Sequence, residues 1–235
     1  MADEQYPDDA PGWAALDRAA ARMCGKQTPH QFSSQRAYDL EGSSPLPAIT
    51  VWEGPQPDHW MYLTYGLSEL FEKSSARADV SGFGFELVFR LPRAADETTP
   101  PTWPLPLLQG IGHYVLSGHG TLDSGHVIDL GGPLVPATEA PTQDGADATA
   151  LRGVIAVPDP RLGKIDTPHG TVLLLALFGL AGDELEAMQA WDLPRKVGLV
   201  AELAPAAITD PARSPYTEDS MTAPIWRRYA TKVLI

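Results

Sequence analysis

Three histidines and an aspartate are the best candidates for chemistry in this sequence. His113, His119 and His126 lie close together along the chain, with Asp123 between the last two. Imidazole nitrogens and carboxylate oxygens together can bind a transition metal. Paired ligands on a helix are three or four residues apart, whereas His113 and His119 are six apart and fall on different faces of a predicted helix. We therefore favour surface or capping histidines, and a metal-dependent hydrolase using the His113–His126 region is the alternative.

Other catalytic signatures do not support an enzyme. The sequence has no G-x-S-x-G, Walker or H-E-x-x-H motif. Its single cysteine, Cys24, excludes an internal disulfide and falls on a predicted amphipathic helix, where a thiol is usually an apolar filler. Glu69 and Glu86 could meet across two strands, which would raise the pKa of one of them; a simpler interpretation pairs Glu86 with Arg90. We predict no catalytic residue, no metal and no other cofactor.

Two predicted strands would carry these carboxylates. The run from residue 81 to 91 alternates with a period of two, which predicts a strand with one buried face, and Pro92 marks its end. The expected buried face holds Phe83, Phe85, Leu87, Phe89 and Leu91, and the expected polar face holds Gly82, Gly84, Glu86, Val88 and Arg90. Residues 58–70 interleave aromatic and β-branched residues, which predicts the neighbouring strand.

The remaining elements predict an α/β fold: a single domain with a mixed β-sheet flanked by α-helices. The expected helices cover residues 11–25, 105–116, 183–191 and 195–203, and the further expected strands cover 46–52, 127–135, 151–157 and 172–178. We expect a flexible acidic arm at 1–10, the domain at 11–210, a solvated loop at 137–150 and a C-terminal tail at 211–235. Within this tail, Trp226 and residues 233–235 are candidates to dock on the domain.

The charge of the chain narrows the class of partner. The 235 residues carry a net charge of −13, which argues against binding to nucleic acid or to an anionic membrane. A basic protein would be the electrostatic complement, although acidity can also serve solubility alone. The acidic N-terminal residues differ from a secretory leader, and the longest apolar stretch, Val172–Leu180, is too short to span a bilayer. We expect a cytoplasmic protein.

Five segments in order resemble the suppressor of fused domain. They are PGWAALDRAAARMCGKQTPHQF, PDHWMYLTYGLSEL, SGFGFELVFRLPR, PPTWPLPLLQGIGHYV and PDPRLGKIDTPHGTVLLLALFGLAGDELEAMQAW. The resemblance covers residues 11–210 and implies a non-enzymatic protein-binding fold. In the animal members the partner, a zinc-finger transcription factor, places a segment between this domain and a second lobe. We expect that lobe to be absent here, so a different partner is expected.

The resemblance also implies a function. Stand-alone bacterial members resemble immunity proteins, which neutralise a toxin by binding it. We therefore predict a bacterial immunity-type protein that sequesters a basic toxin domain or an extended peptide segment; a regulatory adaptor is the alternative. The oligomeric state is left open.

Candidate contact residues for such a partner come from two sources. Trp60, Tyr62 and Tyr65 on the first strand carry amphipathic rings of the kind enriched in interfaces, beside the open backbone of a strand edge that could accept a peptide. The alternative is that these rings are core residues under a helix. The resemblance to the family adds Phe71, Asp79 and Glu86, which fall near positions where its members engage partners.

Overall fold

A large mixed sheet with helices packed against it organises the chain. The computed structural model describes residues 10–33, 45–136 and 149–231. The sheet has the strand order β1-β2-β3-β4-β8-β6-β5, and β7 pairs with β8 outside this path. The predicted α/β fold class is therefore confirmed. Residues 1–9 of the predicted arm, residues 137–148 of the predicted loop and residues 233–235 lie outside the described residues.

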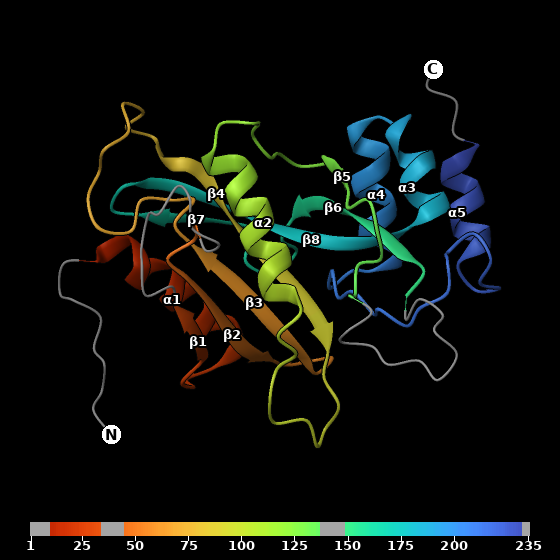
Figure 1. Cartoon of the computed structure of the whole chain (residues 1–235), viewed down its shortest axis with the longest axis horizontal. Coiled ribbons are helices and arrows are strands. Elements are labelled where there is room, and N and C mark those ends of the chain that lie inside the picture. The colour runs from red at the N-terminus through yellow and green to blue at the C-terminus, as the bar shows by residue number, and fades with distance from the viewer. Residues whose placement is uncertain (1–9, 34–44, 137–148, 232–235) are drawn as a thin grey trace. The chain divides into compact units, whose positions relative to one another are not determined.

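Thirteen elements make up the described part of the chain (Figure 1). The helices are α1 (Pro11–Cys24), α2 (Pro104–Leu116), α3 (Gly182–Gln189), α4 (Leu193–Leu203) and α5 (Ala223–Ala230). The strands are β1 (His30–Ser33), β2 (Ala48–Gly54), β3 (His59–Tyr65), β4 (Val80–Pro92), β5 (Val127–Asp129), β6 (Leu151–Pro158), β7 (Lys164–Thr167) and β8 (Gly170–Ala181). No helix among them is long and apolar enough to cross a membrane.

The chain divides into two compact units, and strands β4 and β8 contribute residues to both. The first unit comprises residues 1–88, 93–121 and 161–175, and the second comprises 89–92, 122–160 and 176–235.

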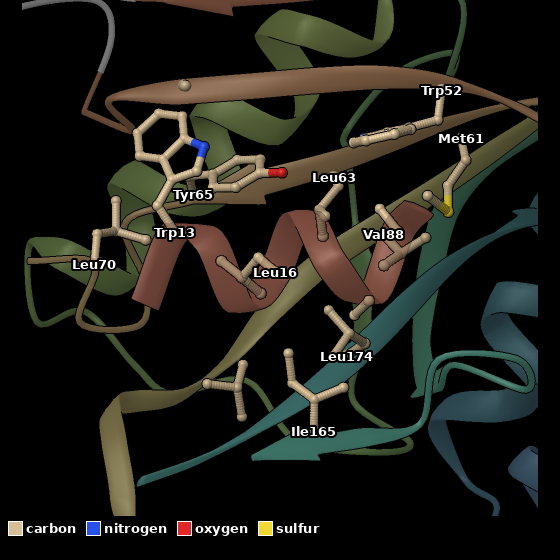
Figure 2. Close-up of a cluster of buried hydrophobic side chains, with 14 of the residues drawn as sticks. Trp13, Leu16, Trp52, Met61, Leu63, Tyr65, Leu70, Val88, Ile165 and Leu174 are labelled. Atoms are coloured by element: carbon tan, nitrogen blue, oxygen red, sulfur yellow. The ribbon is translucent and has the colours of Figure 1, made fainter. Parts of the chain in front are cut away.

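The core of the first unit forms where α1 packs on β2 and β7. Pro11 occupies the first turn of this helix, where its missing N–H is not needed, and Leu16 enters a cluster with side chains of β3, β4, β7 and β8 (Figure 2). The ring of Trp13 stacks on that of Tyr65 with 4.5 Å between centroids. Successive residues of β3 point to opposite faces, so Met61, Leu63 and Tyr65 are the ones that join this cluster.

The core of the second unit includes a segment that we expected to be a tail. Trp226 of α5 is buried in a cluster with Phe178 of β8 and Met188 of α3, so its predicted docking is confirmed. Arg213 donates to the carboxylate of Glu184 at 2.5 and 2.8 Å and to the carbonyl oxygen of Gly179 at 2.8 Å. The residues after 210 therefore supply both apolar and charged contacts to this unit.

The predicted two-faced pattern of β4 is wrong at both ends of the strand. Phe83, expected in the core, is 44% exposed, whereas Glu86 and Arg90, expected on a polar face, are fully buried. Gly82 and Gly84 have φ values of 55° and 88°, which break the regular alternation before the buried stretch begins. From Glu86 to Leu91 every residue is buried, because both faces of the strand are covered.

Two smaller expectations also need correction. The expected strand at 127–135 ends at Asp129, so β5 is only three residues long. Helix α3 begins at Gly182, one residue before the expected start, and the carboxylate of Glu184 accepts a hydrogen bond from the N–H of the capping residue, Ala181, at 2.8 Å.

Candidate functional site

The connection between β3 and β4, which we call the Gly66–Val80 loop, is built around two glutamates. The inner one, Glu86, is fully buried in β4. Its Oε1 accepts hydrogen bonds from the backbone N–H groups of Gly66, Leu67 and Ser68 at 2.8–3.0 Å and from the Ser68 hydroxyl at 2.7 Å. Its Oε2 accepts a hydrogen bond from the Thr64 hydroxyl at 2.7 Å. One side chain thus fixes the start of the loop.

The environment of Glu86 makes its charge sensitive to pH. Burial raises the pKa of Glu86 to about 7, against the opposing effect of the hydrogen bonds from Thr64, Ser68 and Gly66. The predicted ion pair between Glu86 and Arg90 is wrong, because Arg90 binds Asp159 instead. The raised pKa that we expected from a second carboxylate has a different cause, namely loss of water around a carboxylate held by uncharged donors.

The second glutamate, Glu69, accepts hydrogen bonds from residues 73–75 in the middle of the loop. Its Oε1 accepts from the N–H groups of Ser74 and Ser75, both at 2.6 Å. Its Oε2 accepts from Lys73 Nζ at 2.9 Å and from the N–H of Gly82 at 3.1 Å. Burial acts to raise the pKa of Glu69, but the hydrogen bonds from Lys73 and from these backbone groups outweigh it and hold the pKa well below its usual value. The carboxylate is therefore ionised at neutral pH.

Two further contacts tie the loop to its surroundings in the first unit. The carbonyl oxygen of Leu70 accepts from the N–H of Gly12, at the start of α1, at 3.0 Å. The carbonyl oxygen of Asp79 accepts from the N–H and the hydroxyl of Thr171 at 2.9 and 3.0 Å. Gly170 is required beside this contact, since its φ is 113° and a Cβ there would lie 2.7 Å from the backbone of Val80.

Phe71 and Asp79 are the two predicted contact residues that reach the surface. Phe71 is 49% exposed, an unusual position for a large apolar residue. The carboxylate of Asp79 is exposed and lies 3.3 Å from Arg77, whose hydrogen bond lowers the pKa of Asp79. Phe83, which we had assigned to the core, is a third exposed side chain in this part of the first unit. Aromatic side chains are enriched where one protein contacts another, so exposed rings are candidates for such a contact.

The other predicted contact residues are buried. Trp60, Tyr62 and Tyr65 are all fully inaccessible, so the prediction that they offer rings on a surface is wrong and the alternative that they are core residues is supported. The Tyr62 hydroxyl donates to the carbonyl of Pro101 at 2.6 Å, and that of Tyr65 donates to Asp17 at 2.5 Å. Glu86 is likewise buried, and it acts on the loop from within.

The histidines do not gather into a metal-binding group. His113 lies 3.4 Å from the hydroxyl of Ser117, and His119, beyond the end of α2, stacks on Tyr114. The Nδ1 atom of His126 lies 3.1 Å from the N–H of Asp123, as in a local turn. Across residues 10–33, 45–136 and 149–231, no group of three or more His, Cys, Asp or Glu side chains is placed to hold a metal ion.

Comparison with known sequences places the chain among relatives. A family model described as Suppressor of fused protein (SUFU) matches residues 42–214. The Suppressor of fused homolog of Homo sapiens is 32% identical over 175 residues, and so is that of Mus musculus. Each alignment covers 70% of this chain and 34% of the relative, so the chain spans about a third of the length of these curated relatives.

Solved structures show the same fold. A chain of the Sufu-Fu complex crystal structure matches with a TM-score of 0.80 and 27% identity, covering 97% of this chain and 100% of that chain. Drosophila Suppressor of Fused matches with a TM-score of 0.79 and 28% identity, covering 97% of this chain and 56% of that chain. A putative SUFU homolog from Neisseria gonorrhoeae FA 1090 has a TM-score of 0.56 and 12% identity over 86% of this chain and 95% of its own, a likeness of fold alone.

Proposed function

Because this chain belongs to the suppressor of fused family, we propose that it is a non-enzymatic binding domain that sequesters another protein. The family acts in animals as a regulator through protein interactions, and one similar structure is of a Sufu-Fu complex. Since the chain spans only about a third of its curated relatives, their partners do not transfer to it directly. The partner has to be inferred from this chain's own surface and charge.

One observation carries the proposal: the Gly66–Val80 loop exposes Phe71 while its backbone is held by two carboxylates. An aromatic ring exposed on an ordered loop supports a protein contact, since such rings supply much of the energy at the centres of interfaces. Among the described residues, neither Glu69 nor Glu86 belongs to a group of His, Cys, Asp or Glu side chains that could hold a metal ion. Their hydrogen bonds are made to donors of the loop and of the flanking strands β3 and β4.

The net charge of −13 supports a basic partner. Opposite charge accelerates encounter and suppresses the binding of acidic competitors. A basic toxin, neutralised by an immunity-type protein that binds it one to one, fits this charge, and a regulatory adaptor would use the same surface. We propose the basic toxin as the partner because its charge complements that of this chain. No specific observation favours the metal-dependent hydrolase.

The test is direct binding to the products of the adjacent genes. We expect one of them to form a 1:1 complex with the purified protein in calorimetry, with an affinity that falls as salt is raised. Phe71→Ala should weaken the complex by about tenfold or more, as for a hot-spot side chain. Met221→Ala, which truncates an exposed apolar residue of the second unit, is the matched control and should have little effect.

Two results would overturn the proposal. One is the absence of binding to every adjacent product. The other is turnover of a substrate by the purified protein that a single histidine or carboxylate substitution abolishes.

A further inference from the structure

The segment from Phe71 to Asp79 has almost no apolar contacts to hold its shape. Of these nine residues, only Ser75 is partly buried and the rest are exposed. The residues on either side are better covered: Leu70 is buried in the core of the first unit, and Val80 is partly buried. A segment with so little burial belongs to the least stable part of a fold unless polar contacts restrain it. The conformation of the segment from Phe71 to Asp79 therefore depends on its polar contacts.

Most of those contacts converge on one carboxylate. Besides the N–H groups of Ser74 and Ser75, Glu69 accepts from their hydroxyls at 3.1 and 3.3 Å, and Lys73 contributes its ammonium group. Lys73 in turn donates to the hydroxyl of Ser75 and to the carbonyl of Val80. Glu69 therefore links residues 73–75, which follow Phe71 in the chain, to one another and to Gly82 on β4.

Glu69 itself is poorly placed to touch a partner. Its side chain is only 8% exposed, whereas Phe71, two residues later, is 49% exposed. The carboxylate oxygens accept hydrogen bonds from donors within the loop and from the N–H of Gly82 on β4. Any effect of Glu69 on binding must then be exerted through the conformation of its neighbours.

We propose that Glu69 is a positioning residue that holds the Gly66–Val80 loop in one conformation and so sets the affinity for the partner through Phe71 without contacting the partner. A loop ordered before binding loses less conformational freedom when the complex forms. This inference rests on the proposed function. The low pKa of Glu69 agrees with it, since the charge that organises the loop is present throughout the physiological range.

Hydrogen exchange tests the positioning without any partner. In Glu69→Ala, the amides of Ser74 and Ser75 should exchange at least tenfold faster than in the wild type, while the denaturant midpoint of the whole chain is nearly unchanged. Glu69→Gln keeps the shape of the side chain and should show an intermediate effect. Glu72→Ala removes the same charge from an exposed neighbour in the loop and is the matched control. Unchanged exchange of both amides in Glu69→Ala would overturn the inference.

A double-mutant cycle with the partner tests whether Glu69 affects the binding affinity through Phe71. Glu69→Ala should weaken binding about tenfold, with the loss appearing as less favourable binding entropy. In a Phe71→Ala background the same substitution should have a much smaller effect, because the residue that it positions is gone. Equal losses in both backgrounds, or an equal loss from Glu72→Ala, would refute the inference. If the wild type binds no partner, the proposed function fails alone, and the exchange experiment still decides whether Glu69 fixes the loop.

Discussion

Glu86 of the first unit and two carboxylates of the second unit are buried in opposite ways. In the first unit, Glu86 is surrounded by uncharged donors, namely backbone N–H groups and hydroxyls, and it belongs to none of the ion pairs found among the described residues. In the second unit, Asp159 accepts from Arg90 at 2.5 and 3.1 Å, and Glu184 pairs with Arg213. Each of the latter carboxylates is offset by a cation, and Glu86 is not.

The difference determines whether the charge of a buried carboxylate changes with pH. A buried arginine and carboxylate are costly to separate, so the second unit is held by contacts that change little under mild conditions. A buried carboxylate with uncharged donors changes its charge as the pH changes, and Glu86 holds the start of the loop that exposes Phe71. The proposed binding surface therefore lies on the part of the chain whose internal charge can vary.

Removing one member of a buried ion pair should have the largest effect. In Asp159→Ala the guanidinium of Arg90 stays buried without its carboxylate, and both side chains are fully inaccessible in the wild type. We expect the free energy of unfolding to fall by about 3–5 kcal/mol. Urea denaturation at neutral pH measures it.

The control for this comparison is an exposed acid of the same unit. Glu186, on the exposed side of α3, should tolerate replacement by alanine with a change within about 0.5 kcal/mol. A loss below about 1 kcal/mol in Asp159→Ala would show that the pair is not holding the second unit as proposed.

The titration of Glu86 should give the next largest effect. Its pKa rises from 4.5 in the unfolded chain to about 7 in the folded protein, so the folded state binds the proton more tightly. The stability that this proton contributes is fully present below the unfolded pKa and is lost as the pH rises through the folded pKa. Between about pH 5 and pH 8 we expect a loss on the order of 2–3 kcal/mol.

Glu86→Gln isolates this contribution. The amide has the shape of the carboxylate and can still accept from the loop N–H groups, but it does not titrate. The free energy of unfolding of Glu86→Gln should therefore depend less steeply on pH than that of the wild type. Between about pH 5 and pH 8 the difference should be on the order of 2–3 kcal/mol. Parallel pH profiles for the two proteins would contradict the assignment of this titration to Glu86.

The elements of the fold were predictable because local patterns determine them. Pro11 followed by apolar residues at helical spacing predicted α1, and the apolar run from Val172 to Phe178 predicted the covered strand β8. What the pattern could not give is which faces of β4 are covered. An alternating run looks the same whether Arg90 meets water or meets Asp159, which is 69 residues away along the chain.

The candidate site was predictable only in part. Phe71 and Asp79 were reached through the family resemblance, and the structure places both at the surface. Trp60 and Tyr62 were assigned to a binding surface, but they are buried. The sequence of an aromatic-rich strand does not distinguish a strand of the core from a strand of an interface. The role of Glu69 was missed, although a carboxylate four residues before Lys73 and close to two serines is a local signal for a loop closed by its own side chains.

Removing one donor from Glu86 should give the smallest of these effects. Ser68→Ala deletes the hydroxyl that lies 2.7 Å from Oε1 and leaves the three backbone N–H groups in place. At about pH 8, where the carboxylate is charged, we expect a loss of about 1 kcal/mol, and at about pH 5, where it is protonated, a smaller one. The pH dependence of stability should also shift to higher pH, because the charged form has lost a donor.

Two controls sharpen this comparison. Ser214→Ala removes an exposed hydroxyl of the second unit and should leave stability unchanged at both pH values. In a Glu86→Gln background, Ser68→Ala should lose the same stability at both pH values, because the group that titrates is gone. If Ser68→Ala instead costs the same at both pH values in the wild-type background, the Ser68 hydroxyl does not respond to the charge of Glu86, and the first unit is as fixed as the second.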